Sequence, residues 1–119
     1  MKVCVSSQGP DLTSEVDLRF GRAPRFIIYD TESGDYEAID NKQNLQAPQG
    51  AGIQSAQRVV ETGAKALITG HCGPKAYKVL SSAGIEIYLG AEGTVSDALE
   101  AMKAGKLEKA GGPDVEGHW

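Results

Sequence analysis

The apolar residues of the chain recur with two different periods, and each period indicates one kind of element. Short apolar runs between turn residues predict strands, which we place at residues 2–6, 25–31, 36–40, 65–69 and 85–89. Apolar positions three and four residues apart predict three helices, from about residue 51 to 62, from about 74 to 83 and from 94 to 104. Thr94 and Asp97 have the spacing of a capping box at the start of the third helix.

The order of these elements predicts an α/β fold. Strand–helix–strand units require parallel strands with right-handed crossovers, and the opening hairpin adds one antiparallel strand. A three-layer α/β/α domain with a mixed five-stranded sheet and helices on both faces satisfies this order. We expect this domain to span residues 1–107, with a polar, glycine-rich and flexible tail at 108–119.

The topology also predicts where a ligand binds. The carboxyl ends of the parallel strands meet at one edge of the sheet, where open α/β sheets usually bind ligands. Loops at residues 7–24, 41–50, 70–74 and 90–93 converge there. We expect three helix N-termini at this edge, and their N–H groups and partial positive charge favour anions.

The distribution of charge agrees with an anionic ligand. The 119-residue chain has a net charge of −4 and a pI of about 5.1, which argues against a nucleic-acid partner. Arg19, Arg22 and Arg25 nevertheless lie within one short segment, and a local cationic patch on an acidic protein favours a discrete anion. No apolar run approaches the roughly 20 residues that span a bilayer, and no export signal is visible, so we expect a cytoplasmic protein without a membrane partner.

Two residues in the turn before the second helix are candidate metal ligands. Cys72 directly precedes a helix N-terminus, a position that lowers the pKa of a thiol and favours the thiolate; packing in a tight turn is the alternative. His71 adjoins it and is either a second ligand or a solvated loop residue. Cys4 lies within a strand and is expected to pack in the core.

Further contacts to an anion are expected at the helix starts. Gly50, Gly52 and Gly73 leave backbone N–H groups accessible there, and Lys75 adds a cation. Gly50 and Gly52 also fit an ordinary helix start, and the third glycine of a dinucleotide-binding fingerprint is missing.

The sequence Arg-Phe-Gly-Arg-Ala-Pro-Arg-Phe at residues 19–26, Gly-Ala-Gly at 50–52 and Gly-His-Cys-Gly-Pro-Lys-Ala at 70–76 occur in an order that resembles one family. Over about residues 1–107 the chain is similar to the dinitrogenase iron–molybdenum cofactor biosynthesis family. Its members include NifX-like proteins, the C-terminal domain of NifB and the orange protein of sulfate-reducing bacteria, and the short single domain is most similar to the last of these.

The resemblance implies a ribonuclease-H-like sheet with strand order 3-2-1-4-5 and strand 2 antiparallel. It also implies non-catalytic binding or carriage of a metal–sulfur cluster or its precursor. A molybdenum–copper sulfide cluster is the first expectation, and an iron–molybdenum cofactor precursor is the alternative. A carrier of this kind implies a protein that donates or receives the cluster.

Arg19 stands where many members of that family carry histidine. Arginine stays protonated and cannot ligate a metal through a lone pair, so this residue favours a thiometallate anion that is held by charge.

Three other functions compete with cluster carriage. A protein-interaction module without its own metal remains an alternative. A thiol-dependent enzyme would use Cys72 and His71, but no third orienting residue is evident. A nuclease needs carboxylates at the strand ends, and the first strand contains none.

Overall fold

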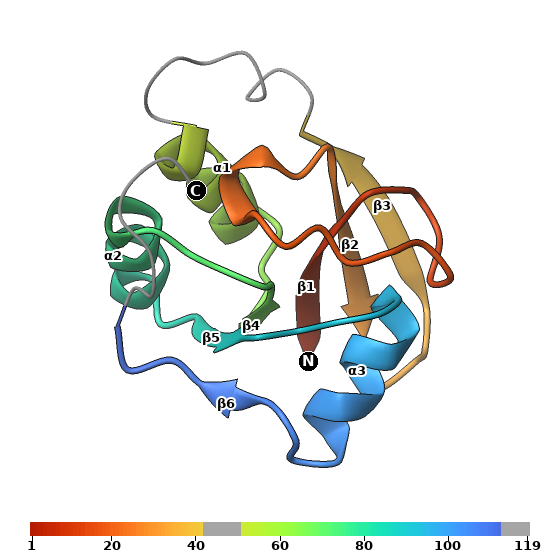
Figure 1. Ribbon diagram of the computed structural model, residues 1–119. Helices are drawn as coiled ribbons and strands as arrows, with labels where there is room; N and C mark the ends of the chain where they lie inside the picture. The colour runs from red at the N-terminus through yellow and green to blue at the C-terminus, as the bar shows by residue number, and fades with distance from the viewer. Residues whose placement is uncertain (42–50, 113–119) are drawn as a thin grey trace.

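The elements follow one another as the hydrophobic pattern indicates. The computed structural model (Figure 1) describes residues 1–41 and 51–112. Its strands are β1 (Lys2–Ser7), β2 (Arg25–Asp30), β3 (Tyr36–Asp40), β4 (Ala66–Ile68), β5 (Glu86–Leu89) and β6 (Glu108–Lys109). Its helices are α1 (Ala51–Glu61), α2 (Pro74–Ser82) and α3 (Val95–Lys103), with one 3-10 turn, η1 (Phe20–Arg22). None of the helices in these residues has the length and apolar character that crossing a bilayer requires.

The strands form one mixed sheet in the order β3-β2-β1-β4-β5-β6. β4 pairs in parallel with both β1 and β5. β2 pairs antiparallel with both β1 and β3. The α/β class, the order of the first five strands and the reversal of the second strand are therefore confirmed.

The sheet has one strand more than the five that the sequence predicts. β6 pairs antiparallel with β5, where Lys109 lies opposite Tyr88. Lys109 Nζ also lies 3.4 Å from a carboxylate oxygen of Glu86. A two-residue charged edge strand shows no apolar alternation, which is why the pattern missed it. We expected a flexible tail from residue 108, but residues 108–109 belong to the sheet. Residues 113–119 of that expected tail lie outside the described residues.

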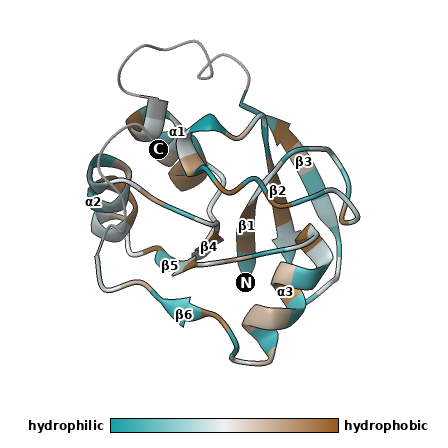
Figure 2. Cartoon of the chain, in the orientation of Figure 1, coloured by the Kyte–Doolittle hydropathy of each residue, from teal (hydrophilic) through white to brown (hydrophobic). Residues whose placement is uncertain are grey.

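The sheet buries apolar side chains on both faces, because successive side chains of a strand point to opposite sides. In β1, Cys4 packs in the cluster under α1 and α2, whereas Val3 and Val5 pack in the cluster under α3. Figure 2 shows hydrophobic residues in brown along β1 and β4. The result is the expected three layers, with α1 and α2 on one face and α3 on the other.

The carboxyl ends of β1, β3, β4 and β5 lie at one edge of the sheet, which we call the loop edge, and β2 begins there. The first loop, between β1 and β2, is fixed at this edge by backbone pairing. Isolated backbone bridges join it to three other segments, at Ser7–Val16, Glu15–Thr94 and Arg19–His71. These bridges hold the loop against the ends of the central strands.

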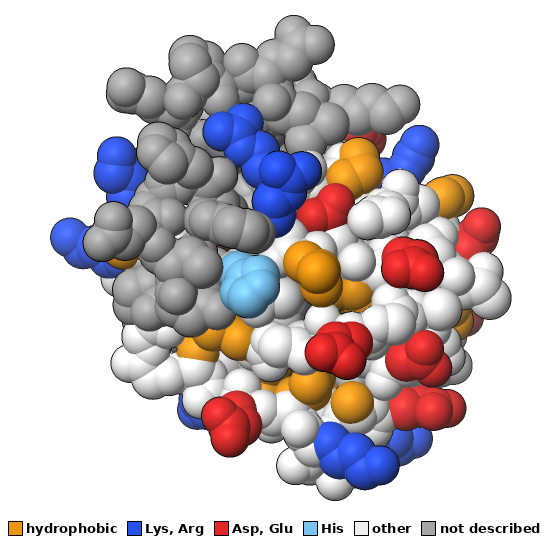
Figure 3. Space-filling model, in the orientation of Figure 1, with side chains coloured by type: hydrophobic (Ala, Val, Ile, Leu, Met, Phe, Trp, Pro, Cys, Tyr) orange, Lys and Arg blue, Asp and Glu red, His pale blue; other side chains and the backbone are white. Residues whose placement is uncertain are grey.

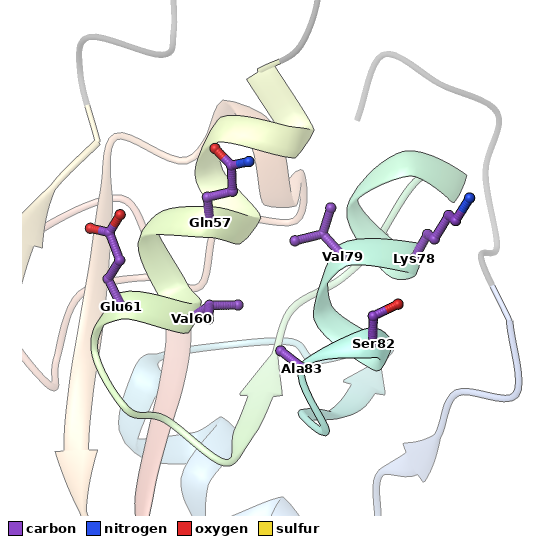
Figure 4. Close-up of a pocket in the computed structure, with 7 residues that line it drawn as sticks. All are labelled: Gln57, Val60, Glu61, Lys78, Val79, Ser82 and Ala83. Carbon is purple, nitrogen blue, oxygen red and sulfur yellow. The ribbon is translucent and has the colours of Figure 1, made fainter.

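An open groove lies between the C-terminal halves of α1 and α2, away from the loop edge (Figure 4). Its volume is about 620 Å³, and its lining residues are Gln57, Val60, Glu61, Lys78, Val79, Ser82 and Ala83. The groove contains none of the residues that the sequence predicts for the site.

Candidate functional site

Arg19 lies directly beside His71. The His71 N–H donates to Leu18 O (2.8 Å), and the Phe20 N–H donates to His71 O (3.3 Å). These two bonds make a parallel bridge between Arg19 and His71. Side chains of directly paired residues leave the backbone on the same side of a ladder, so Arg19 and His71 present their side chains toward the same region. Figure 3 shows basic side chains gathered beside the pale-blue histidine on this face.

Buried polar groups hold this part of the first loop in place. Ser6 Oγ lies 2.7 Å from Asp17 O and 2.7 Å from Thr69 Oγ1. Asp17 Oδ1 accepts the N–H of Arg19 at 2.9 Å. Ser6, Asp17 and Thr69 are all buried, where an unsatisfied polar group would cost free energy. Sequence reasoning missed these three residues, although Ser6 and Thr69 stand out as polar residues that follow the apolar runs of two strands.

Two helix starts meet at the same place. Gly73 is the N-cap of α2 and offers no side-chain cap, and Pro74 occupies the first turn. A methyl group on Gly52, in the first turn of α1, would lie 3.4 Å from Ala76 Cβ, so the two helix N-termini are adjacent. Their partial positive charges therefore act on one region. Gly50 lies outside the described residues.

Two more of the predicted cations accompany these helix starts. Lys75 is exposed in the first turn of α2. Arg22 ends η1, which packs against α1, and it is half-buried. Together with Arg19 and two helix N-termini, they make this part of the loop edge electropositive, although the whole chain is acidic.

Arg25 lies on a different face. It begins β2 and alternates with Phe26, whose side chain packs in the cluster under α1 and α2. Ile27, two residues on, packs in the cluster under α3. By the period of the strand, Arg25 points to the α3 side. The structure thus groups Arg19 with His71 and places Arg25 apart from the start of α2.

The start of α3 differs from the other two. The N–H groups of Val95 and Ser96 donate to carbonyls of the first loop at 2.9 Å each, and the Asp97 N–H donates to Thr94 Oγ1 at 3.1 Å. The predicted capping box is therefore present. The Thr94 N–H also holds the pKa of the Asp97 carboxyl below its usual value, so this end carries a negative charge. We expected three helix starts to attract an anion. At the start of α3, however, these N–H groups already donate hydrogen bonds within the protein.

Both cysteines are buried in the apolar cluster under α1 and α2. Cys72 is 0% exposed, and its Sγ lies 3.6 Å from Gly73 O. Burial raises the pKa of the Cys4 thiol, which keeps it protonated. Within residues 1–41 and 51–112, no three His, Cys, Asp or Glu side chains are placed to hold a metal ion. The geometry therefore favours packing for Cys72 over coordination of a surface ligand.

Replacing Cys72 by alanine is expected to lower stability by about 1–2 kcal/mol, because a buried sulfur is lost from a packed core. If the chain binds the metal–sulfur cluster that the resemblance implies, we expect the same variant to retain it. Denaturant unfolding and retention of the cluster's colour measure the two effects, and Cys4→Ala is the matched control from the same core cluster. Loss of colour in Cys72→Ala alone, at unchanged stability, would place the thiol in the site.

Comparison with known proteins extends the likeness over nearly the whole chain. The sequence model of the dinitrogenase iron-molybdenum cofactor family matches residues 1–105. The apo form of the orange protein from Desulfovibrio gigas superposes with a TM-score of 0.93 at 37% identity, over 96% of each chain. The NMR structure of a candidate NifB protein from Thermotoga gives a TM-score of 0.85 at 39% identity, over 98% of each chain. An uncharacterised protein of Methanocaldococcus jannaschii is 33% identical over 95 residues, 76% of this chain and 78% of that protein.

Proposed function

Since the chain belongs to the dinitrogenase iron-molybdenum cofactor family, we propose that it binds and carries an anionic metal–sulfur cluster at the loop edge without catalysis of its own. The cargo is a molybdenum–copper sulfide cluster, with an iron–molybdenum cofactor precursor as the alternative. The protein acts in the cytoplasm and exchanges the cluster with a donor or recipient protein. Family membership supports cluster binding, and the charges gathered at the loop edge support an anionic cargo.

One observation carries this proposal: Arg19 is fixed beside His71, next to the adjacent starts of α1 and α2. We call Arg19, Arg22, His71 and Lys75, with the first turns of α1 and α2, the cationic seat. Sulfide-rich anions accept hydrogen bonds and carry diffuse negative charge, so guanidinium and backbone N–H groups suit them. The N–H donors of helix starts add to this attraction.

Holding the cargo by charge also fits the sulfur chemistry of the chain. Cys4 and Cys72 are buried in the core, and the described residues offer no set of three metal ligands. A cluster that brings its own sulfide ligands needs no protein thiolate. His71 can donate a hydrogen bond to a sulfide, or supply one nitrogen ligand.

Reconstitution tests the proposal. The full chain is incubated with tetrathiomolybdate and a copper salt and then passed over a desalting column. We expect a coloured species that elutes with the protein, with molybdenum and copper measured in the same fractions. If the colour and both metals elute with the small molecules, the proposed cargo is wrong. Retention of an iron-containing precursor instead would favour the alternative cargo.

A further inference from the structure

Leu18 is an exposed apolar side chain on a fixed backbone. It is 48% exposed, yet its carbonyl accepts the His71 N–H at 2.8 Å. Its Cα lies so close to the turn that a methyl on Gly70 would be only 2.8 Å from it. Because this backbone is already ordered, burying Leu18 against a partner costs little further conformational entropy. Leu18 is therefore well suited to anchor an interface.

Three exposed carboxylates lie on the segments around it. Asp11 and Glu15 belong to the first loop, and Glu92 belongs to the loop before α3. The Glu15–Thr94 bridge holds these two loops together. The ion pairs that residues 1–41 and 51–112 form with one another include Met1 with Asp30 and Glu32, and Lys109 with Glu86, all away from these three carboxylates. Figure 3 shows acidic and hydrophobic side chains on this face, next to the basic group.

We propose that Leu18 and the carboxylates of Asp11, Glu15 and Glu92 form a docking surface for a basic protein. This inference rests on the proposed function, because the partner is then the protein that delivers or removes the cluster. Leu18 directly precedes Arg19, so a partner docked here lies beside the cationic seat. Complementary charge speeds the encounter of the two proteins, and a basic partner brings positive charge close to an anionic cargo.

A second copy of this chain is a poor occupant for the same surface. In a two-fold contact with its axis at Leu18, the two sets of Asp11, Glu15 and Glu92 carboxylates would lie close to each other. Like charges opposed across an interface disfavour the contact. The charge pattern therefore selects a basic partner.

An NMR titration with two synthetic peptides tests the docking surface. One peptide carries leucine flanked by lysine and arginine, and the other has the same apolar residues flanked by glutamate. At low salt we expect the basic peptide to shift the amide signals of residues 11–18 and 92–94, and the acidic peptide to shift none of them. We expect Leu18→Ser to weaken binding by up to about tenfold, the loss that corresponds to leaving the exposed half of a leucine side chain in water. Glu15→Lys with Glu92→Lys should weaken it by a similar factor.

Val60→Ser is the matched control, since Val60 is 38% exposed and lies in the α1–α2 groove. It should leave peptide binding unchanged. Equal binding of the basic peptide to Leu18→Ser and wild type would overturn the inference, and so would a dimer in solution that Leu18→Ser dissolves. Retention of the copper–thiomolybdate colour by Leu18→Ser should equal that of wild type. Failure of wild type to retain the colour, with docking intact, would count against the proposed function alone.

Discussion

Replacing Arg19 and Arg22 together by glutamate is expected to weaken retention of a copper–thiomolybdate cluster at least about tenfold. Each replacement turns an attraction into a repulsion beside an anion. Two unit charges 4 Å apart interact by about 1 kcal/mol in water and about 4 kcal/mol near a protein surface. Every 1.4 kcal/mol is a factor of about ten in affinity, so even the lower value, summed over two reversals, gives this loss. Equilibrium titration followed by absorption spectroscopy measures the effect, which should shrink as salt is added.

The matched control reverses two lysines at the opposite edge of the sheet. Lys65 precedes β4 and Lys106 follows α3, and both are exposed. The double replacement Lys65→Glu and Lys106→Glu changes the net charge by the same amount, but far from the cationic seat. We expect it to retain the cluster nearly as well as wild type. An equal loss in both double variants would mean that net charge, and not a local seat, attracts the cluster.

Gly70→Ala is expected to destabilise the protein by about 1–3 kcal/mol, as overpacking does in a close-packed region. A methyl at this position would lie 2.7 Å from Leu18 O and 2.8 Å from Leu18 Cα. Both are backbone atoms, so the strain can be relieved only if the first loop moves away from the turn. That movement breaks the Arg19–His71 pairing, so we also expect weaker retention of the cluster. Denaturant unfolding and the cluster titration measure the two effects.

Gly111→Ala is the control for this substitution, because a methyl there would meet nothing within 4 Å. We expect its stability to stay within about 0.5 kcal/mol of wild type, as for most surface substitutions. If Gly70→Ala were as stable as wild type and held the cluster equally well, the close approach of Leu18 to Gly70 would have no part in forming the seat.

The five principal strands and three helices could be predicted because each follows a clear apolar period. β1, for example, places Val3 and Val5 on one face and Cys4 on the other. β6 could not be predicted in this way, because Glu108 and Lys109 are joined to the sheet by backbone bonds and an ion pair. Neither interaction leaves a pattern of apolar residues.

The site was predicted less completely than the fold. The strand topology predicted that Arg19 and His71 lie at the loop edge, where the structure has them, because this position follows from strand direction alone. It did not predict the face of the sheet on which Arg25 lies, which is opposite to that of its neighbour Phe26. It also did not predict that Cys72 is buried within a turn. It also overlooked the closed start of α3, because the carbonyls that satisfy it come from the first loop. Contacts between segments that are distant in the sequence decide the burial of Cys72 and the start of α3, and a single sequence does not contain them; the face of Arg25 follows from its alternation with Phe26 along β2.

A thiol-dependent enzyme is less compatible with the structure than a carrier. Such an enzyme needs an accessible thiolate, whereas Cys72 is fully buried and Cys4 is both buried and held protonated. The Cys72→Ala variant separates the two functions, because a carrier that uses charge keeps its cargo without this sulfur.

An NMR titration of the ¹⁵N-labelled chain with the copper–thiomolybdate cluster tests the central claim most directly. If guanidinium groups and two helix starts hold the anion, the largest amide shifts fall in residues 19–22 and 71–76, and the capped start of α3 at residues 95–97 stays unchanged. Shifts centred on α3 or β6, with residues 19–22 and 71–76 unmoved in the presence of bound cluster, would contradict the claim.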